Sequence, residues 1–219
     1  MLNPGDYLGT YEATACQLCL DFSNTVDWRT SNQPDDRLSS YTHLVAWGLL
    51  VKILTEDEAQ DLIRKAAENP QAASMVLERA VILREVIYRV FSAASRDLPA
   101  DPADISILNS EMNIAFKHLR ITSTHNQFTW VWEGASDAFD RMLWPVARSS
   151  ADLLVSDELS RVGECQGEGC GWLYIDTSKN HSRRWCNMND CGNREKARQH
   201  YKRKRKTMAQ EKIPAMNEL

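Results

Sequence analysis

The sequence predicts an α+β protein, in which a mostly helical N-terminal domain with a small β-hairpin precedes a compact C-terminal module. Apolar residues recur every three or four positions between residues 41 and 119, which is the spacing of amphipathic helices. Residues 128–132 alternate instead, as a half-buried strand does. Four cysteines then lie close together near the C-terminus. We therefore expect a helical domain over residues 1–158, a cysteine module over 159–208 and a tail over 209–219.

Composition narrows the class of protein. The chain has 219 residues, of which 43% are hydrophobic and 26% charged, so it can build a sizeable core. No stretch approaches the roughly 18 to 20 apolar residues of a membrane span, and the N-terminus lacks the pattern of a secretory signal. We expect no membrane association and a cytoplasmic location. Thiols stay reduced there, so spaced cysteines favour a metal site over disulfides.

The first patterned segment covers residues 18–22, where alternating apolar residues predict a strand. Polar side chains at its end could hold a small molecule: Asp21, Asn24, Thr25 and Arg29. The alternative is turn and cap chemistry, which we favour. Cys16 and Cys19 are spaced as a metal pair, but no further ligands lie nearby, so they are interpreted as ordinary thiols of the fold.

Helices are expected over most of residues 41–119. Residues 41–54 form the first, and the pair Thr55 and Glu58 is a capping box for a second that runs to about residue 68. Asn69 and Pro70 break the chain before a long helix whose apolar stripe spans residues 76–94. Asp101 and Pro102 then begin another helix with the same period. The two long stripes predict an antiparallel helical core.

The period changes over residues 121–132, which predicts a β-hairpin with a turn near His125. Phe128, Trp130 and Trp132 share one face, which we expect to be covered. Ser136 is expected to cap one more helix, kinked at Pro145 because proline lacks the backbone donor.

The four cysteines form two C-x4-C pairs, Cys165 with Cys170 and Cys186 with Cys191. Glycines in the first pair suit a tight knuckle, residues 172–175 and 183–185 are strand-like arms, and good helix formers follow Cys191. This order predicts a C-terminal treble-clef zinc finger with one structural Zn²⁺. Four thiolates fill a tetrahedron and leave no place for a catalytic water. A nuclease using His181 or His200 would need its own metal site, and neither residue has an acidic or histidine cluster beside it, so we expect that the protein is not an enzyme. We expect the loss of one thiol to unfold this module and spare the helices.

Charge is distributed unevenly. Residues 179–206 hold eleven Lys or Arg against two acids, although the whole chain has a net charge of −4. An acidic body with a basic end indicates a polyanionic partner for that end, bound in a salt-dependent way. The alternative is a solvated or protein-docking helix. The expected nucleic-acid-binding residues, with Arg194 and Arg198 as the candidates for base contacts, are Lys179, Arg183, Arg184, Arg194, Arg198, Tyr201, Lys202, Arg203 and Arg205.

The segment CGWLYIDTSKNHSRRWCNMNDCGNREKARQHYKRKR resembles the CGNR zinc-finger family, which is named for residues 191–194. LCLDFSNTVDWR is similar to the opening of the ABATE domain that precedes this finger in stress-induced transcriptional regulators, although Ser23 replaces an expected hydrophobic residue. The resemblance implies a treble-clef, DNA-binding regulator whose front domain senses a signal.

The sequence thus favours a DNA-binding transcriptional regulator. A small-molecule-sensing or protein-interaction module and an RNA-binding protein remain the alternatives. The expected partners are DNA, or else RNA, together with a small-molecule effector. A homodimer stays open, because no heptad seam or self-pairing edge is identified.

Overall fold

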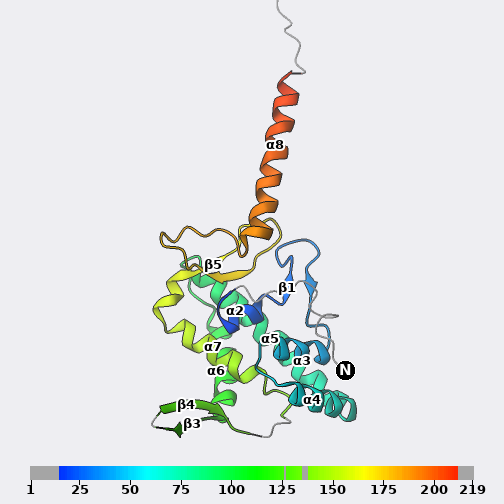
Figure 1. Cartoon of the computed structure of the whole chain (residues 1–219), viewed down its shortest axis with the longest axis vertical. Helices are drawn as coiled ribbons and strands as arrows, with labels where there is room; N and C mark the ends of the chain where they lie inside the picture. Colours follow the sequence, from blue (N-terminus) through cyan, green and yellow to red (C-terminus); the bar gives the residue numbers. More distant parts are fainter. Residues whose placement is uncertain (1–14, 126, 135–137, 212–219) are drawn as a thin grey trace, which may run out of the picture.

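The computed structural model describes residues 15–125, 127–134 and 138–211 (Figure 1). Its centre is the long helix α5 (Pro70–Ala94), which contacts every other helix of the body. These helices are α2 (Leu18–Ser23), α3 (Tyr41–Leu50), α4 (Glu56–Glu68), α6 (Pro102–Phe116) and α7 (Leu143–Leu154). The mostly helical body expected from the sequence is confirmed. None of the described helices has the length and apolar character needed to cross a bilayer.

Local signals in the sequence set several helix starts. At α4, the Thr55 hydroxyl accepts a hydrogen bond from Glu58 N, and the Glu58 carboxylate accepts one from Thr55 N, so the capping box is confirmed. Asn69 caps α5 through Ala72 N, with Pro70 in the first turn. Asp101 caps α6 in the same way. Each cap satisfies a backbone N–H that would otherwise lack a partner.

Two predicted elements are wrong in type or extent. The segment predicted as a strand at residues 18–22 is the helix α2, which is buried around its whole circumference. Periodicity cannot separate a short, fully buried helix from a strand. The helix predicted over residues 41–54 ends at Leu50, because Lys52 adopts φ +61° and turns Leu54 back into the core.

The predicted kink at Pro145 is also wrong. Helix α7 begins at Leu143, so Pro145 lies in the first turn, where a missing backbone donor costs nothing. Ser136, the expected cap of this helix, lies outside the described residues.

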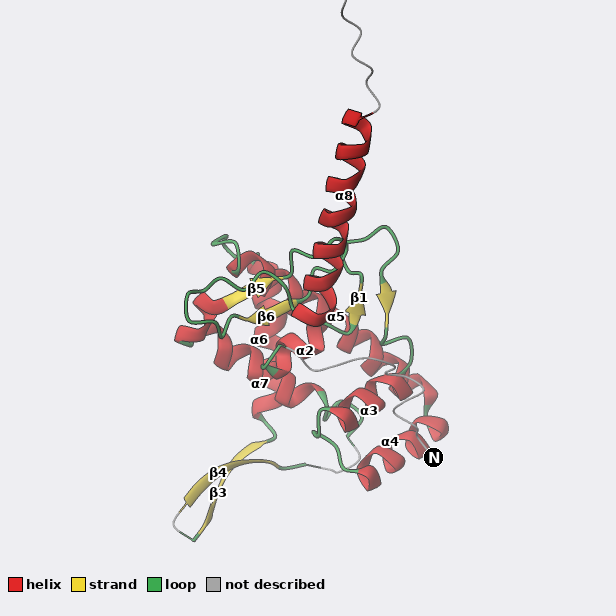
Figure 2. Ribbon diagram, turned by 45° about the horizontal axis from the view of Figure 1, so that its top comes forward, coloured by secondary structure: helices red, strands yellow, loops and turns green. Residues whose placement is uncertain are grey.

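Three antiparallel strand pairs complete the described fold: β1 (Val26–Asp27) with β2 (Asp35–Asp36), β3 (Leu119–Thr124) with β4 (Gln127–Trp132), and β5 (Val162–Glu164) with β6 (Leu173–Ile175). The β3–β4 pair confirms the predicted hairpin, and Trp130 lies opposite Ile121. It extends from the body as an arm (Figure 2). Phe128 and Trp130 are 79% and 51% exposed, so the expectation of a covered aromatic face is wrong at this end.

The C-terminal part comprises a 3₁₀ turn (Asp157–Arg161), the β5–β6 pair, a π-helical turn (Met188–Gly192) and α8 (Asn193–Glu211). Val162, Leu173 and Ile175 belong to the same buried cluster as the helices of the body. Helix α8 instead extends away from the body, at the end of the molecule opposite the β3–β4 arm (Figure 1). The strands of the cysteine module therefore share a core with the helices, whereas the basic helix lies outside it.

Candidate metal centre and basic helix

The first cysteine pair lies in the turn that connects β5 to β6. Cys170 N donates to the carbonyl of Gly167, and Gly167 N points at the Cys165 sulfur at 3.4 Å. Gly171 has φ +69°, and a Cβ there would lie 2.6 Å from Thr30 Cγ2. Glycine is therefore required here both by the left-handed backbone and by the close approach of the residue 28–31 loop.

The second pair is arranged by a loop and a helical turn. Cys186 precedes the turn, which Asn187 caps by accepting from Asn189 N, and Cys191 lies inside it. The turn leads directly into α8. The metal centre therefore fixes the base of the basic helix.

The four sulfurs fit one zinc ion. All lie within 4.8 Å of one another, and Cys186 Sγ is 3.7 Å from both Cys170 Sγ and Cys191 Sγ. A tetrahedron with Zn–S bonds of about 2.3 Å has edges of about 3.8 Å, which matches these separations. The four side chains are buried. Among the described residues, no other group of three or more His, Cys, Asp or Glu side chains could hold a metal ion. The set therefore forms a structural zinc site with a filled coordination sphere.

The electrostatics of the site agree with a bound cation. Hydrogen bonds among the thiols, burial and the like charge of neighbouring thiolates raise the pKa of Cys170 and Cys186, and the hydrogen bonds lower the pKa of Cys165. Four thiolates can thus coexist only around a cation. Arg194 supplies further positive charge, because its Nη2 donates to Cys191 Sγ at 2.9 Å.

The hairpin expected between residues 172–175 and 183–185 is wrong in its second arm. β6 pairs with β5, and residues 183–185 form no strand. The Arg183 side chain holds this segment instead, donating to the carbonyls of Ile175, Trp185 and Cys186. A side chain therefore replaces the expected strand ladder.

The module is docked on the body through backbone groups. Arg29 N donates to the carbonyl of Cys170 and Thr30 N to that of Gly169, both at 3.1 Å. The side-chain amide of Asn24 binds both backbone groups of Leu173: Asn24 Nδ2 donates to Leu173 O at 2.8 Å, and Leu173 N donates to Asn24 Oδ1 at 2.9 Å. Trp172 Nε1 donates to Val26 O. The loop after α2 is thus bonded directly to the zinc knuckle.

The base of α8 is held by ion pairs and an aromatic contact. Arg194 pairs with Asp190 at 3.0 Å, and its guanidinium carbon lies 4.4 Å from the centroid of the Trp28 ring. Arg198 pairs with Glu195 and Glu168. The two arginines expected to contact bases therefore already have partners within the chain.

Beyond this base, the described side chains of α8 are solvent-exposed. Every side chain from residue 199 to residue 205 is exposed, including Tyr201, Lys202, Arg203, Lys204 and Arg205. Residues 193–205 hold seven Lys or Arg and one Glu. The exposed positive charge is therefore concentrated on the outer turns of α8.

Comparison with known protein families agrees with this arrangement. The family described as "Putative stress-induced transcription regulator", ABATE, matches residues 17–157, and the CGNR zinc finger matches residues 161–204. The chain belongs to the ABATE family. No curated protein matches it in sequence. The order of the two matches confirms the resemblance noted in the sequence, and both families are regulatory or zinc-finger families.

The ABATE region contains the four residues considered for a ligand site, and the structure gives each an internal partner. Asp21 accepts from Ala15 N, and the Thr25 hydroxyl donates to Phe22 O. Asn24 makes the clamp on Leu173, and Arg29 donates to Ser23 O. These contacts are turn and docking chemistry. Their role in holding a ligand stays an untested prediction.

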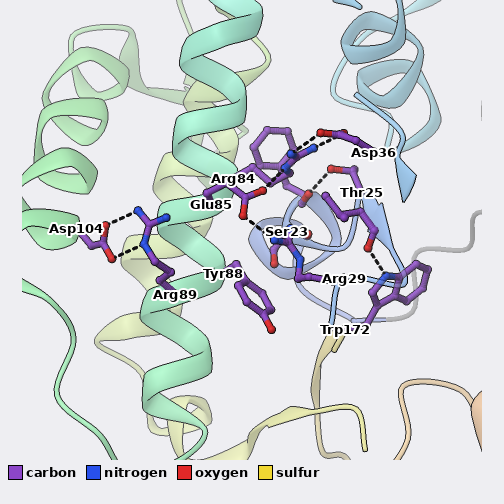
Figure 3. A network of polar contacts seen from close by, with 12 residues as sticks. Ser23, Thr25, Arg29, Asp36, Arg84, Glu85, Tyr88, Arg89, Asp104 and Trp172 are labelled. Atoms are coloured by element: carbon purple, nitrogen blue, oxygen red, sulfur yellow. Dashed lines mark hydrogen bonds and ion pairs between the residues drawn. The ribbon is translucent and has the colours of Figure 1, made fainter. Parts of the chain in front are cut away.

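A partly buried ion-pair network surrounds Arg29 in the ABATE region (Figure 3). Arg29 donates to Glu85 at 2.6 Å and lies over the Tyr88 ring, while Arg84 binds Asp36 through two bonds and Glu85 through one. Burial alone would raise the pKa of Glu85, but hydrogen bonds and charge from Arg29 and Arg84 lower it overall. The network anchors the loop that contacts the CGNR finger.

Of the remaining expected nucleic-acid-binding residues, one is exposed in a loop and two have partners within the chain. Lys179 is exposed in the loop after β6. Arg184 donates to Gln166 Oε1 at 2.8 Å, and Arg183 is committed to the backbone as described. Two further residues of this region were not predicted from the sequence: Lys196, which is exposed on α8, and Trp28, whose contact with Arg194 joins segments 166 residues apart. The basic run includes Lys196, but no local signal identifies Trp28.

Proposed function

We propose that the chain is a DNA-binding transcriptional regulator, in which the CGNR finger presents α8 to the duplex. The observation that supports this most is the projecting helix, in which residues 199–205 include four exposed Lys or Arg and no acid. Its 19 residues make a rod of about 28 Å. The major groove of B-DNA accepts an α-helix, and phosphate contacts supply much of the affinity.

The base of the helix gives the proposal its mechanism. Zinc, the Cys191 turn and the docked knuckle fix where α8 begins, so a bound duplex would meet a pre-oriented helix rather than a mobile tail. Arg194 and Arg198 are paired at this base, which favours phosphate contacts by Lys196, Lys202, Lys204 and Arg205. Base contacts by Arg194 and Arg198 would require these pairs to exchange.

The proposal includes three further points. The filled zinc site supports a non-catalytic role, and its reduced thiolates support a cytoplasmic location. Residues 1–158 and 159–208 act as two functional units in this proposal, although their strands and helices share a core. RNA is the alternative polyanion.

The test is fluorescence anisotropy of the zinc-loaded protein with a labelled 20-base-pair duplex of mixed sequence, across a series of salt concentrations. We compare Lys202→Ala/Lys204→Ala with the matched control Arg64→Ala/Lys117→Ala, which removes the same charge from exposed body positions. Loss of two phosphate contacts should weaken binding and reduce the salt slope by about 1.8. The control should bind as wild type does.

Two outcomes would reject the proposal. The first is equal weakening by both double variants, which would indicate general charge rather than α8. The second is the absence of salt-dependent duplex binding. Competition with an unlabelled RNA duplex of the same sequence separates the alternatives, since tighter binding to RNA would favour that partner.

A further inference from the structure

A cavity of about 590 Å³ lies where the ABATE region meets the CGNR finger. The ABATE region contributes Asp27, Trp28 and Arg37, while the finger contributes Trp172, Asn189 and Arg194 among others. Binding sites for small molecules usually occupy about 300–1,000 Å³ and combine aromatic walls with a few polar groups. The size and composition of this cavity fall within that range.

Trp28 is the unusual residue of the cavity. Its side chain is 43% exposed, and its backbone has φ +52°, which is rare for a bulky residue. The next two backbone N–H groups hold this conformation through their bonds to the knuckle carbonyls. Strained backbone of this kind occurs preferentially at functional sites. The strained backbone at Trp28 therefore places an indole ring at the wall of the cavity.

The Trp28 ring already binds a planar group. The Arg194 guanidinium lies over it at 4.4 Å, which shows that a flat, delocalised group fits against this face. The ring of Trp172 lines the same cavity. A ligand with a flat ring would find apolar surface of matching shape.

The charged side chains of the lining are paired with one another. Asp27 forms an ion pair with Arg37, and Asp190 forms one with Arg194, so these four side chains are already paired. The zinc ligands Cys170 and Cys186 also line the cavity and add negative charge. The exposed Asn189 side chain offers both a donor and an acceptor. Because the acids are already paired and the sulfurs are negative, these features favour an uncharged ring with polar edges over a phosphate or a carboxylate.

We propose that this cavity binds a free, uncharged nitrogen heterocycle of the nucleobase class. The ligand replaces the Arg194 guanidinium on Trp28, whose ring provides the stacking surface, and Asn189 recognises the edge of the ligand ring. Binding involves residues of both family regions and does not depend on nucleic acid, so the proposal is separate from the proposed function.

The test uses the full-length, zinc-loaded protein with adenosine, guanosine, cytidine and uridine, and with ribose as a ligand that lacks the base. Isothermal calorimetry and tryptophan fluorescence should show saturable binding of at least one nucleoside and none of ribose. Trp28→Leu should weaken binding by about tenfold, the scale of base stacking on an aromatic side chain. Trp28→Phe should retain most of the affinity, and Asn189→Leu should change the preference among the four bases.

Trp130→Leu is the matched control, because Trp130 is similarly exposed but lies on the β3–β4 arm. It should leave nucleoside affinity unchanged. Zinc content and Tm identify any variant that fails to fold, in which case Trp28→Phe and Asn189→Leu decide. The proposal is overturned if no nucleoside binds at millimolar concentration, or if the Trp28 and Asn189 variants all bind as wild type does. It is also overturned if Trp28→Leu weakens only the binding of single-stranded DNA, since the base would then come from the nucleic acid.

Discussion

Replacing Asn24 with leucine tests whether the ABATE region and the zinc finger unfold as one unit. Asn24 is 1% exposed, and its amide satisfies both backbone groups of Leu173 on β6. Cys165 N donates to Trp172 O, and hydrogen-bonded and non-hydrogen-bonded pairs alternate along an antiparallel hairpin. The next pair, Glu164 with Leu173, is therefore a non-hydrogen-bonded one. The N–H and C=O of Leu173 therefore face away from β5, and Asn24 is their partner. Leucine fills a similar volume and leaves no space for a water molecule.

The expected cost follows from these two buried groups. Each backbone group left without a partner costs about 1–3 kcal/mol, so Asn24→Leu should lower the free energy of unfolding by about 2–6 kcal/mol. That is a large fraction of the 5–15 kcal/mol typical of folded proteins, and it corresponds to a fall in Tm of about 5–20 °C. The matched control is Asn109→Leu, since Asn109 is exposed on α6.

The assay follows urea unfolding with two signals, helical circular dichroism and zinc release to a chromogenic chelator. Because the clamp joins the end of α2 to β6, both transitions should shift together in Asn24→Leu, and neither should shift in Asn109→Leu. A loss below about 0.5 kcal/mol would refute the reasoning, since it is the scale of ordinary surface substitutions. A shift in zinc release alone would also refute it, because the finger would then unfold independently.

Three further predictions concern the metal centre and its surroundings. In the zinc-loaded protein, only Cys16 should react quickly with a thiol reagent, because Cys16 is exposed, whereas burial raises the pKa of Cys19 to about 12. Rapid labelling of the Cys16→Ser variant would contradict this prediction. Gly171→Ala should lower the free energy of unfolding by about 1–3 kcal/mol, because its Cβ would meet Thr30 at positive φ, and an unchanged urea midpoint would contradict the contact. The folded-state pKa of Glu85 is lowered, so its contribution to stability is present above about pH 4.3 and lost as pH falls through the folded pKa. Urea unfolding from pH 6 to pH 3 should therefore show a weaker pH dependence for Glu85→Gln than for wild type, and equal slopes would contradict it.

Local chemistry in the sequence predicted much of the fold. The caps at Thr55, Asn69 and Asp101 depend on side chains within three residues, so the sequence is sufficient to place the helices that they start. The zinc site followed from cysteine spacing for a similar reason, since few arrangements bring two C-x4-C pairs together in one small module.

The errors arose where tertiary contacts decide. Residues 18–22 are helical because α5, α7 and β6 bury them on all sides, which no periodicity reports. The segment at residues 183–185 is held by the Arg183 guanidinium, and a strand pattern cannot anticipate a side chain that replaces a ladder. On the β3–β4 arm, Arg148 lies 4.8 Å from the centroid of the Trp130 ring, yet Phe128 and Trp130 remain exposed. Whether core elements cover such a face depends on the whole arrangement of the body.

The shared core also changes what the zinc site does. The sequence suggested that losing one thiol would unfold the finger and spare the helices. However, Leu173 and Ile175 pack in the same cluster as α5, and the knuckle carbonyls bind the loop after α2. Loss of zinc should therefore also destabilise the ABATE region.

Arg194 connects the cavity, the metal centre and the basic helix, and the strength of its contacts limits what this connection can do. It touches Trp28, Cys191 and Asp190 and belongs to α8. A ring that displaced Arg194 from Trp28 would remove a contact of about 0.5–1 kcal/mol at such a partly exposed site, which changes an equilibrium by only about two- to fivefold. Moving a two-state equilibrium from 1:99 to 99:1 takes about 5.5 kcal/mol. Displacement of Arg194 alone can therefore adjust the affinity of α8 for a polyanion but cannot switch it. A complete switch would require the knuckle bonds of residues 29 and 30 to break as well, because these bonds hold the finger against the ABATE region.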